Sequence, residues 1–216
     1  MKLIELPARR DPDPHSDPIA LALVAKTLEA GFEGLTVEGV ACRANVTVDE
    51  FHQRFVDLDH CALDVYERHI AAFERRVGEA FNRQPDWRRG IRAAAYSAAA
   101  WLESHPDTTR FGSIEVLRMR NEMVRVRREE LFAFCAQMID QGREAAPDPQ
   151  AVPENASIVA IGSILQLLTR RLQEGAELHF PEVTRESLYG VVRTYLGDDV
   201  AREELEIAQS MTAERA

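Results

Sequence analysis

The chain has 216 residues, with 26 basic and 36 acidic side chains and a formal net charge of −10 at pH 7. This length allows one or two domains with a substantial core. The acidic balance excludes nucleic-acid binding driven by overall charge, because proteins of that kind are basic. The three cysteines are widely spaced, which argues against a disulfide framework and suits a reducing cytoplasm. No apolar run approaches the roughly 20 residues that span a membrane, so we expect a cytoplasmic protein with no membrane partner.

The N-terminal residues 1–16 are rich in proline and charge and lack hydrophobic periodicity, which predicts a flexible arm. Arg9 and Arg10 could reach DNA, as N-terminal arms do in some DNA-binding domains; a solvated tail is the alternative. Asp17 and Pro18 predict the cap and the first residue of a helix. The buried face of this helix is expected to comprise Leu21, Val24, Ala25 and Leu28.

Two short helices joined by a tight turn are predicted between residues 36 and 55. Thr36 is a candidate N-cap for the first helix. Asn45 tolerates the left-handed backbone that ends a helix. Thr47 and Glu50 have the spacing of a capping box at the start of the second helix. This layout is typical of a helix-turn-helix, whose second helix enters the major groove of DNA.

At these positions the sequence resembles the N-terminal DNA-binding motif of the tetracycline-repressor (TetR) family. The matching residues are Gly31, Phe32, Thr36, Val37, Val40, Ala41, Ala44, Asn45, Val46, Thr47, Phe51, His52 and Phe55. The resemblance implies an all-α fold in which a long helix joins a three-helix head to a helical body for ligand binding and dimerisation. The residues expected to contact DNA are Thr36, Arg43, Thr47, Val48, Asp49, Glu50, His52 and Gln53.

The predicted head carries little of the positive charge that DNA binding usually requires. From Leu35 to Cys61 the chain has five acidic and two basic residues, a net charge of −3. DNA affinity comes largely from Lys and Arg side chains that neutralise phosphates, and Leu58 stands where the resembled family usually has Lys. Two interpretations follow: a DNA-reading head, or a TetR-like dimeric sensor or interaction module with weakened or lost DNA binding.

The remainder of the chain shows helical periodicity, with no strand-like alternation and no internal repeat. Helices are predicted over residues 58–82, 86–104, 107–117, 120–143, 154–174 and 181–196 and from 198 onwards, with the clearest loop at 145–153. The sequence therefore predicts an all-α protein with about nine or ten helices.

A homodimer is predicted through the last two long helices, over 154–174 and 181–196. Apolar residues in the first of them alternate spacings of three and four, as in the seam of a helix bundle. The expected contact residues are Ile158, Ile161, Leu165, Leu168, Leu172, Leu188, Val192 and Tyr195.

A small, mostly apolar effector is expected in the body, because in the resembled family a ligand usually lies between the long helix and the next three helices. Met and aromatic residues suit an adaptable apolar pocket, although core packing would explain them equally well. The candidate ligand-binding residues are Tyr96, Trp101, Phe111, Met119, Met123 and Phe132.

Other candidate sites are weaker. The cluster of Arg118, Arg120, Arg125, Arg127 and Arg128 could form a second site for an anion. Arg118 and Arg125 have carboxylates four residues on, at Glu122 and Glu129, which favours a solvated helix face instead. His60, Cys61 and Asp64 lack the spacing of a zinc site, so we expect no metal. No nucleophile turn is present, so we expect neither an enzyme nor a cofactor.

The sequence thus predicts a homodimeric TetR-like transcription regulator, expected to be a repressor, that binds double-stranded operator DNA under control of a small-molecule effector. The expected domains are an arm (1–16), a helix-turn-helix domain (17–62) and a ligand-binding and dimerisation domain (63–216).

Overall fold

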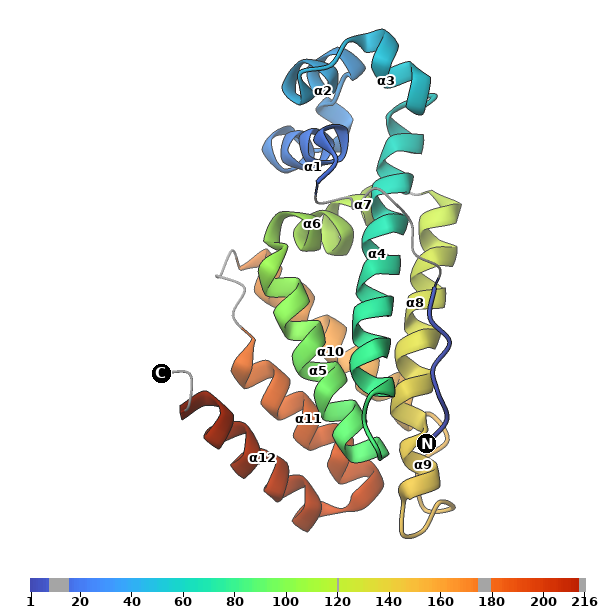
Figure 1. Cartoon of the computed structure of the whole chain (residues 1–216), viewed down its shortest axis with the longest axis vertical. Coiled ribbons are helices and arrows are strands. Elements are labelled where there is room, and N and C mark those ends of the chain that lie inside the picture. The colour runs from blue at the N-terminus through green and yellow to red at the C-terminus, as the bar shows by residue number, and fades with distance from the viewer. Residues whose placement is uncertain (8–15, 120, 175–179, 214–216) are drawn as a thin grey trace. The chain divides into compact units, whose positions relative to one another are not determined.

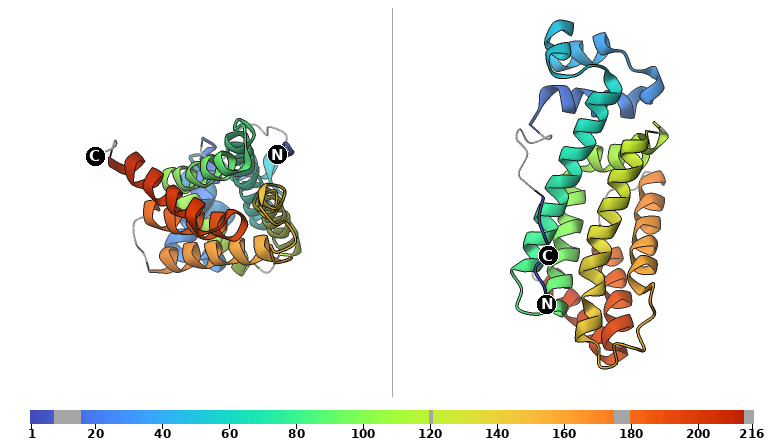
Figure 2. Two further views of the ribbon diagram at one scale, coloured as in Figure 1. Left: turned by 90° about the horizontal axis from the view of Figure 1, so that it is seen from below. Right: turned by 90° about the vertical axis from the view of Figure 1, so that its right-hand side faces the viewer.

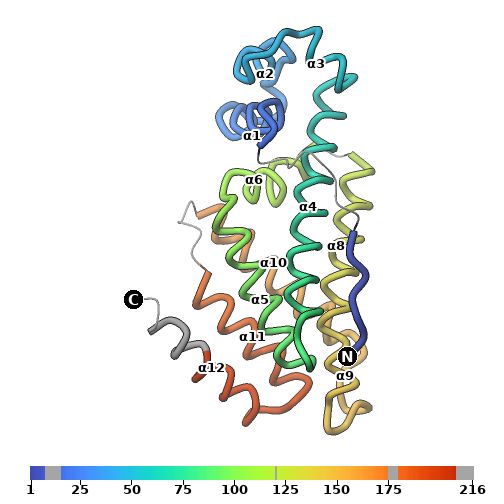
Figure 3. Tube along the Cα trace, viewed as in Figure 1, coloured from blue at the N-terminus to red at the C-terminus, as the bar shows by residue number. Residues whose placement is uncertain are grey.

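A computed structural model describes residues 1–7, 16–119, 121–174 and 180–213, with side chains up to residue 207. Over these residues all regular secondary structure is helical, which confirms the predicted all-α class. The elements (Figures 1 and 3) are α1 (Pro18–Ala30), a 3-10 turn η1 (Phe32–Gly34), α2 (Val37–Ala44), α3 (Val48–Arg54), α4 (Leu58–Asn82), α5 (Trp87–Ser104), α6 (Pro106–Arg110), a π-helical turn η2 (Phe111–Glu115), α7 (Val116–Arg118), α8 (Glu122–Asp140), α9 (Gly142–Ala145), α10 (Ala156–Gln173), α11 (Pro181–Leu196) and α12 (Asp198–Ala213).

The chain forms two compact units. Unit 1 comprises Met1–Leu6, Glu74–Glu103 and Leu131–Ala216, and unit 2 comprises Pro7–Phe73 and Ser104–Glu130. Unit 2 therefore contains the predicted helix-turn-helix together with α6, η2 and α7. Within the described residues, no helix combines the length and the apolar character needed to cross a bilayer.

In unit 1, α11 packs against both α10 and α12 (Figures 1 and 2). Trp87 at the start of α5 anchors this core: its Nε1 donates to the carbonyl oxygen of Met138 at 3.0 Å, and its ring lies 5.2 Å from that of Tyr195. Gly142 leaves room for the indole, because a Cβ there would lie 2.4 Å from it.

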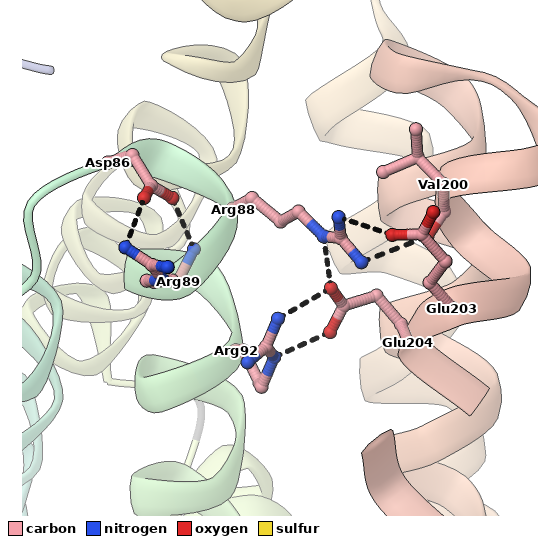
Figure 4. A network of polar contacts seen from close by, with 7 residues as sticks. All are labelled: Asp86, Arg88, Arg89, Arg92, Val200, Glu203 and Glu204. Atoms are coloured by element: carbon pink, nitrogen blue, oxygen red, sulfur yellow. Dashed lines mark hydrogen bonds and ion pairs between the residues drawn. The ribbon is translucent and has the colours of Figure 1, made fainter. Parts of the chain in front are cut away.

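A buried ionic network joins α5 to α12 (Figure 4). Glu204 is 1% exposed, and both of its oxygens accept hydrogen bonds from Arg92, at 2.6 and 2.7 Å. Arg88 also donates to Glu204, and its other nitrogens reach Glu203 and the carbonyl of Val200. This network supplies the Glu204 carboxylate with charged hydrogen-bond donors inside unit 1. A buried charge is costly without such partners.

The first six residues are not a flexible arm, and that expectation is wrong for them. Ile4 is buried, and its backbone N–H and C=O both bond to the Asn82 side chain, at 2.8 and 2.9 Å. Leu6 packs on Gly78, where an added Cβ would lie 2.3 Å from it. Apolar side chains and a paired backbone thus hold this segment on unit 1. Residues 8–15, including Arg9 and Arg10, lie outside the described part of the chain.

Two helix predictions are corrected in detail. The single helix expected over 107–117 is divided into α6, η2 and α7. A π turn brings residues five apart toward the same side, and Phe111 and Val116 are both fully buried. The helix expected over 120–143 ends at Asp140 and is followed by α9. Leu21, expected on the buried face of α1, is 46% exposed. Thr27 is buried instead, and its hydroxyl is satisfied by donating to the carbonyl of Leu23 at 2.8 Å.

Candidate nucleic-acid interface

The local geometry of the helix-turn-helix follows its capping residues. The Thr36 Oγ1 accepts from the Gly39 N–H at 3.1 Å and begins α2. Asn45 ends α2 in the left-handed region, with φ 56° and ψ 43°. At the start of α3, the Thr47 Oγ1 accepts from the Glu50 N–H at 3.1 Å, while Glu50 Oε2 accepts from the Thr47 N–H at 2.7 Å. The predicted caps and turn are confirmed.

The inner side of the motif is apolar and buried. Val40 and Ala41 of α2 and Phe51 of α3 are at most 1% exposed, and Phe55 follows α3 at 4%. In α1, Leu23 is fully buried, and α1 packs against α2. Because the apolar face points inward, the polar face of α3 is left for solvent or a partner.

The structure places the eight predicted DNA-contacting residues mostly on the surface of unit 2. Val48 is half-buried, and the others are exposed: Thr36, Arg43, Thr47, Asp49, Glu50, His52 and Gln53. Contact of these residues with DNA stays a prediction.

Ion pairs engage both arginines of the motif. Arg43 Nη1 lies 2.8 Å from Glu29 Oε1, and Arg54 Nη2 lies 2.5 Å from Asp17 Oδ2. Glu50 is engaged as well: the hydrogen bond from the Thr47 backbone, assisted by the Thr47 hydroxyl, lowers the pKa of Glu50. The carboxylate of Glu50 is therefore ionised and held at the helix cap, which limits its freedom to read a base.

A buried charge cluster that sequence inspection missed holds the motif together. The Asp17 carboxylate caps α1 through the Ile19 N–H and also accepts from Arg54 of α3 and Arg68 of α4. Arg68 is 5% exposed and pairs in turn with Asp64, at 2.5 Å. The sequence predicts Asp17 only as a cap, because its arginine partners lie 37 and 51 residues away and no local spacing indicates them.

Burial of Asp17 alone raises its pKa. The hydrogen bonds from Arg54 and the attraction of both arginines outweigh burial, so the pKa of Asp17 is lowered overall. Beside this cluster, burial raises the pKa of the Cys61 thiol to about 12, which keeps it protonated and unreactive. No three His, Cys, Asp or Glu side chains in the described ranges are grouped as metal ligands.

The candidate ligand-binding residues are divided between the two units. Trp101 in unit 1 and Phe111 in unit 2 are buried, whereas Met123 is 53% exposed. Half-buried positions are occupied by Tyr96 and Phe132 in unit 1 and by Met119 in unit 2. Their role in ligand binding stays a prediction.

The predicted dimer contacts separate into two groups. Ile158 is 56% exposed on α10, and Ile161, Leu165 and Leu168 are half-buried. Four others are buried within this chain and are therefore not free to face a second copy: Leu172, Leu188, Val192 and Tyr195. The expectation for these four is corrected: Leu188, Val192 and Tyr195 lie on α11, which packs against α9, α10 and α12 of unit 1, and Leu172 is buried near the end of α10.

The fold and the motif define a class: an all-helical protein with an N-terminal helix-turn-helix. More specifically, the chain has the fold of TetR-type transcription regulators. The transcriptional regulator FadR from Bacillus subtilis, solved in complex with stearoyl-CoA, matches with a TM-score of 0.68 and 15% identity, over 83% of this chain and 97% of that one. The fatty acid degradation regulator FadR from Bacillus halodurans matches with a TM-score of 0.67 and 14% identity, over 82% and 97%.

A TetR family transcription regulator from Marinobacter aquaeolei VT8 has a TM-score of 0.62 and 17% identity, over 83% of this chain and 94% of that one. These likenesses confirm the resemblance to the TetR family at the level of the fold. By sequence alone, no family model and no curated protein matches the chain.

Proposed function

We propose that this protein is a TetR-type DNA-binding transcription regulator that acts as a repressor. The observation that carries the proposal is the helix-turn-helix of unit 2, with its two capped helices, left-handed Asn45 turn and buried inner face. The start of α3 exposes Thr47 and Asp49, while the Glu50 carboxylate is held at the cap of the helix. Thr can touch a thymine methyl group, and the Asp49 carboxylate can accept from the cytosine amino group.

The working form is proposed to be a homodimer through α10. Ile158 and Val159, neighbours near the start of this helix, are 56% and 66% exposed. Exposed apolar surface of this kind often marks a contact with another protein. At Gly162 an added Cβ would meet nothing within 4 Å, so a second backbone has room to approach. A symmetric contact would cover the apolar side chains of both copies at once.

The effector is proposed to be a mostly apolar small molecule that binds the helical body. Trp101 is buried in unit 1, and Tyr96 and Phe132 of the same unit are half-buried. Aromatic side chains of this kind suit an apolar ligand site. The FadR structure with stearoyl-CoA is an example of this fold with a ligand that has a long apolar part. Binding of the effector would shift the populations of two dimer geometries that differ in DNA affinity.

An electrophoretic shift assay tests DNA binding, using a pool of genomic fragments at low and at physiological salt. We expect one or a few fragments to be retained at both salt concentrations. Gln53→Ala, at an exposed position of α3, should weaken retention, whereas Gln137→Ala, exposed on α8 of unit 1, should not. Retention that is equal for all fragments and is lost at physiological salt would contradict a sequence-reading head.

A second function is favoured by one observation: the two arginines of the motif are both paired with carboxylates, Arg43 with Glu29 and Arg54 with Asp17. A dimeric sensor or interaction module of the same fold, without DNA binding, would need no free cation there. Under this alternative the assay retains no fragment even at low salt, while the dimer and its ligand binding persist.

A further inference from the structure

Two histidines hold one peptide group at the junction of α3 and α4. The Nδ1 atom of His52 lies 3.3 Å from the carbonyl oxygen of Phe55. The Nδ1 atom of His60 lies 3.4 Å from the backbone nitrogen of Val56. This oxygen and this nitrogen belong to the same peptide unit, so one ring contacts its carbonyl oxygen and the other contacts its amide nitrogen. Phe51 and Phe55 add edge contacts, with ring centroids 5.5 Å from His52 and 5.9 Å from His60.

The two contacts require opposite tautomers. A carbonyl oxygen only accepts, so His52 carries its proton on Nδ1, and in the neutral ring Nε2 is a bare acceptor. A backbone N–H only donates, so His60 Nδ1 accepts and its neutral ring already carries a proton on Nε2. Protonation of His60 would remove the acceptor from the Val56 N–H, whereas protonation of His52 would keep its bond to Phe55 and add a second donor.

This asymmetry matters for a phosphate ligand. Phosphate oxygens are acceptors, so neutral His52 offers them nothing from Nε2, while protonated His52 offers a charged donor. His52 is exposed at the end of α3. The charged groups of the surrounding elements are Asp17, Lys26 and Glu29 of α1 and its cap, Glu38 and Arg43 of α2, Asp49, Glu50 and Arg54 of α3, and Asp57, Asp59 and His60 at the start of α4.

Because the arginines nearest the motif are paired with carboxylates, a proton on His52 would supply positive charge where it is scarce. We propose that DNA binding takes up one proton per head at His52, which makes the affinity for DNA phosphates pH-dependent. The inference rests on the proposed function, since it assigns the proton to a DNA-binding head. Imidazole is the side chain whose charge changes between about pH 5 and 8. Each proton taken up raises the association constant by up to about tenfold for each unit that the pH falls.

The test is a binding titration on a random-sequence DNA duplex at pH 6 and pH 8 with constant ionic strength. Wild type should bind more than about tenfold more tightly at pH 6. His52→Gln should bind at both pH values like wild type at pH 8, and His52→Lys should bind tightly at both. His60→Gln should keep the pH dependence. His105→Gln, a control outside the motif, should behave as wild type.

A second readout does not depend on affinity. The ring nitrogen shifts of His52 at about pH 7 should move toward the doubly protonated form when the duplex is added, with circular dichroism to verify that each variant is folded. Equal binding at the two pH values, or pH dependence that persists in His52→Gln or is lost in His60→Gln, overturns the inference and leaves the proposed function standing. Absence of DNA binding at both pH values overturns the two together.

Discussion

Arg54, the last residue of α3, places its Nη2 atom 2.5 Å from the Oδ2 atom of Asp17, the cap of α1. Asp17 also accepts from Arg68 of α4 at 3.1 Å, so one buried carboxylate ties three helices of the helix-turn-helix unit together. The arginine that the motif could have offered to a DNA phosphate is thereby used to hold the recognition helix. Arg54 therefore cannot both hold α3 in place through Asp17 and offer its positive charge to DNA.

Asp17→Asn should lower the free energy of unfolding by about 3 kcal/mol, because it leaves the buried Arg68 with an incomplete set of partners. Asparagine still caps a helix well, so the decrease in the free energy of unfolding is due to the lost ion pairs and not to a lost cap. Urea unfolding at pH 7 measures it. Asp59→Asn, at an exposed position of α4, should change stability by no more than about 0.5 kcal/mol.

The same substitution has a defined pH dependence. The pKa of Asp17 is lowered in the folded protein, so its contribution is present above the ordinary carboxyl pKa and is lost as pH falls through the folded pKa. The stability difference between wild type and Asp17→Asn should therefore shrink as the solution is acidified. A difference that is constant from neutral to acidic pH would contradict the ionic role of Asp17.

Glu204→Gln should destabilise the protein by about 3 kcal/mol, because Arg88 and Arg92 would keep their charge beside a buried neutral amide. Its neighbour offers a matched control: Glu203 pairs with Arg88 but has 60% of its side chain exposed. Glu203→Gln should cost less than about 1 kcal/mol, since exposed pairs are screened by solvent. Chemical unfolding that gives equal losses for the two variants would show that burial of Glu204 does not set the strength of the network.

Ile158→Arg should convert the proposed dimer to a folded monomer. In the single chain Ile158 is more than half exposed, so arginine there costs little folding stability, but in the dimer it would bury an unpaired charge. Sedimentation velocity at micromolar concentration measures the association, and Gln137→Arg on exposed α8 surface serves as the control. A monomeric wild type, or an Ile158→Arg variant that stays dimeric, would contradict the α10 interface.

Leu58→Lys should tighten DNA binding on any sequence and steepen its salt dependence by about 1 unit, equivalent to one added phosphate contact. Leu58 is the first residue of α4, where free helix amides also favour an anion. Titrations of wild type and variant over a range of salt, on a selected operator and on random DNA, measure the effect. If wild type selects no operator and the variant gains only nonspecific affinity, the module without DNA binding becomes the better account.

Local sequence was sufficient to determine much of this protein. Thr36, Asn45, Thr47 and Glu50 predicted the caps and the turn of the helix-turn-helix, because capping interactions span only a few residues. The bounds of α4 followed from periodicity and from the proline after it. The all-α class and the resemblance to TetR-type regulators came from the same short-range signals.

Only the tertiary structure determined which side chains pair with each other and which apolar faces are covered. Pairs such as Asp17 with Arg54 and Arg92 with Glu204 join residues 37 and 112 positions apart, so sequence spacing gives no sign of them. Helical periodicity predicts both Leu188 and Ile158 as dimer contacts. In the folded chain Leu188 is buried within unit 1, whereas Ile158 is exposed. Periodicity identifies an apolar face, but which surface covers that face depends on contacts between segments distant in the chain.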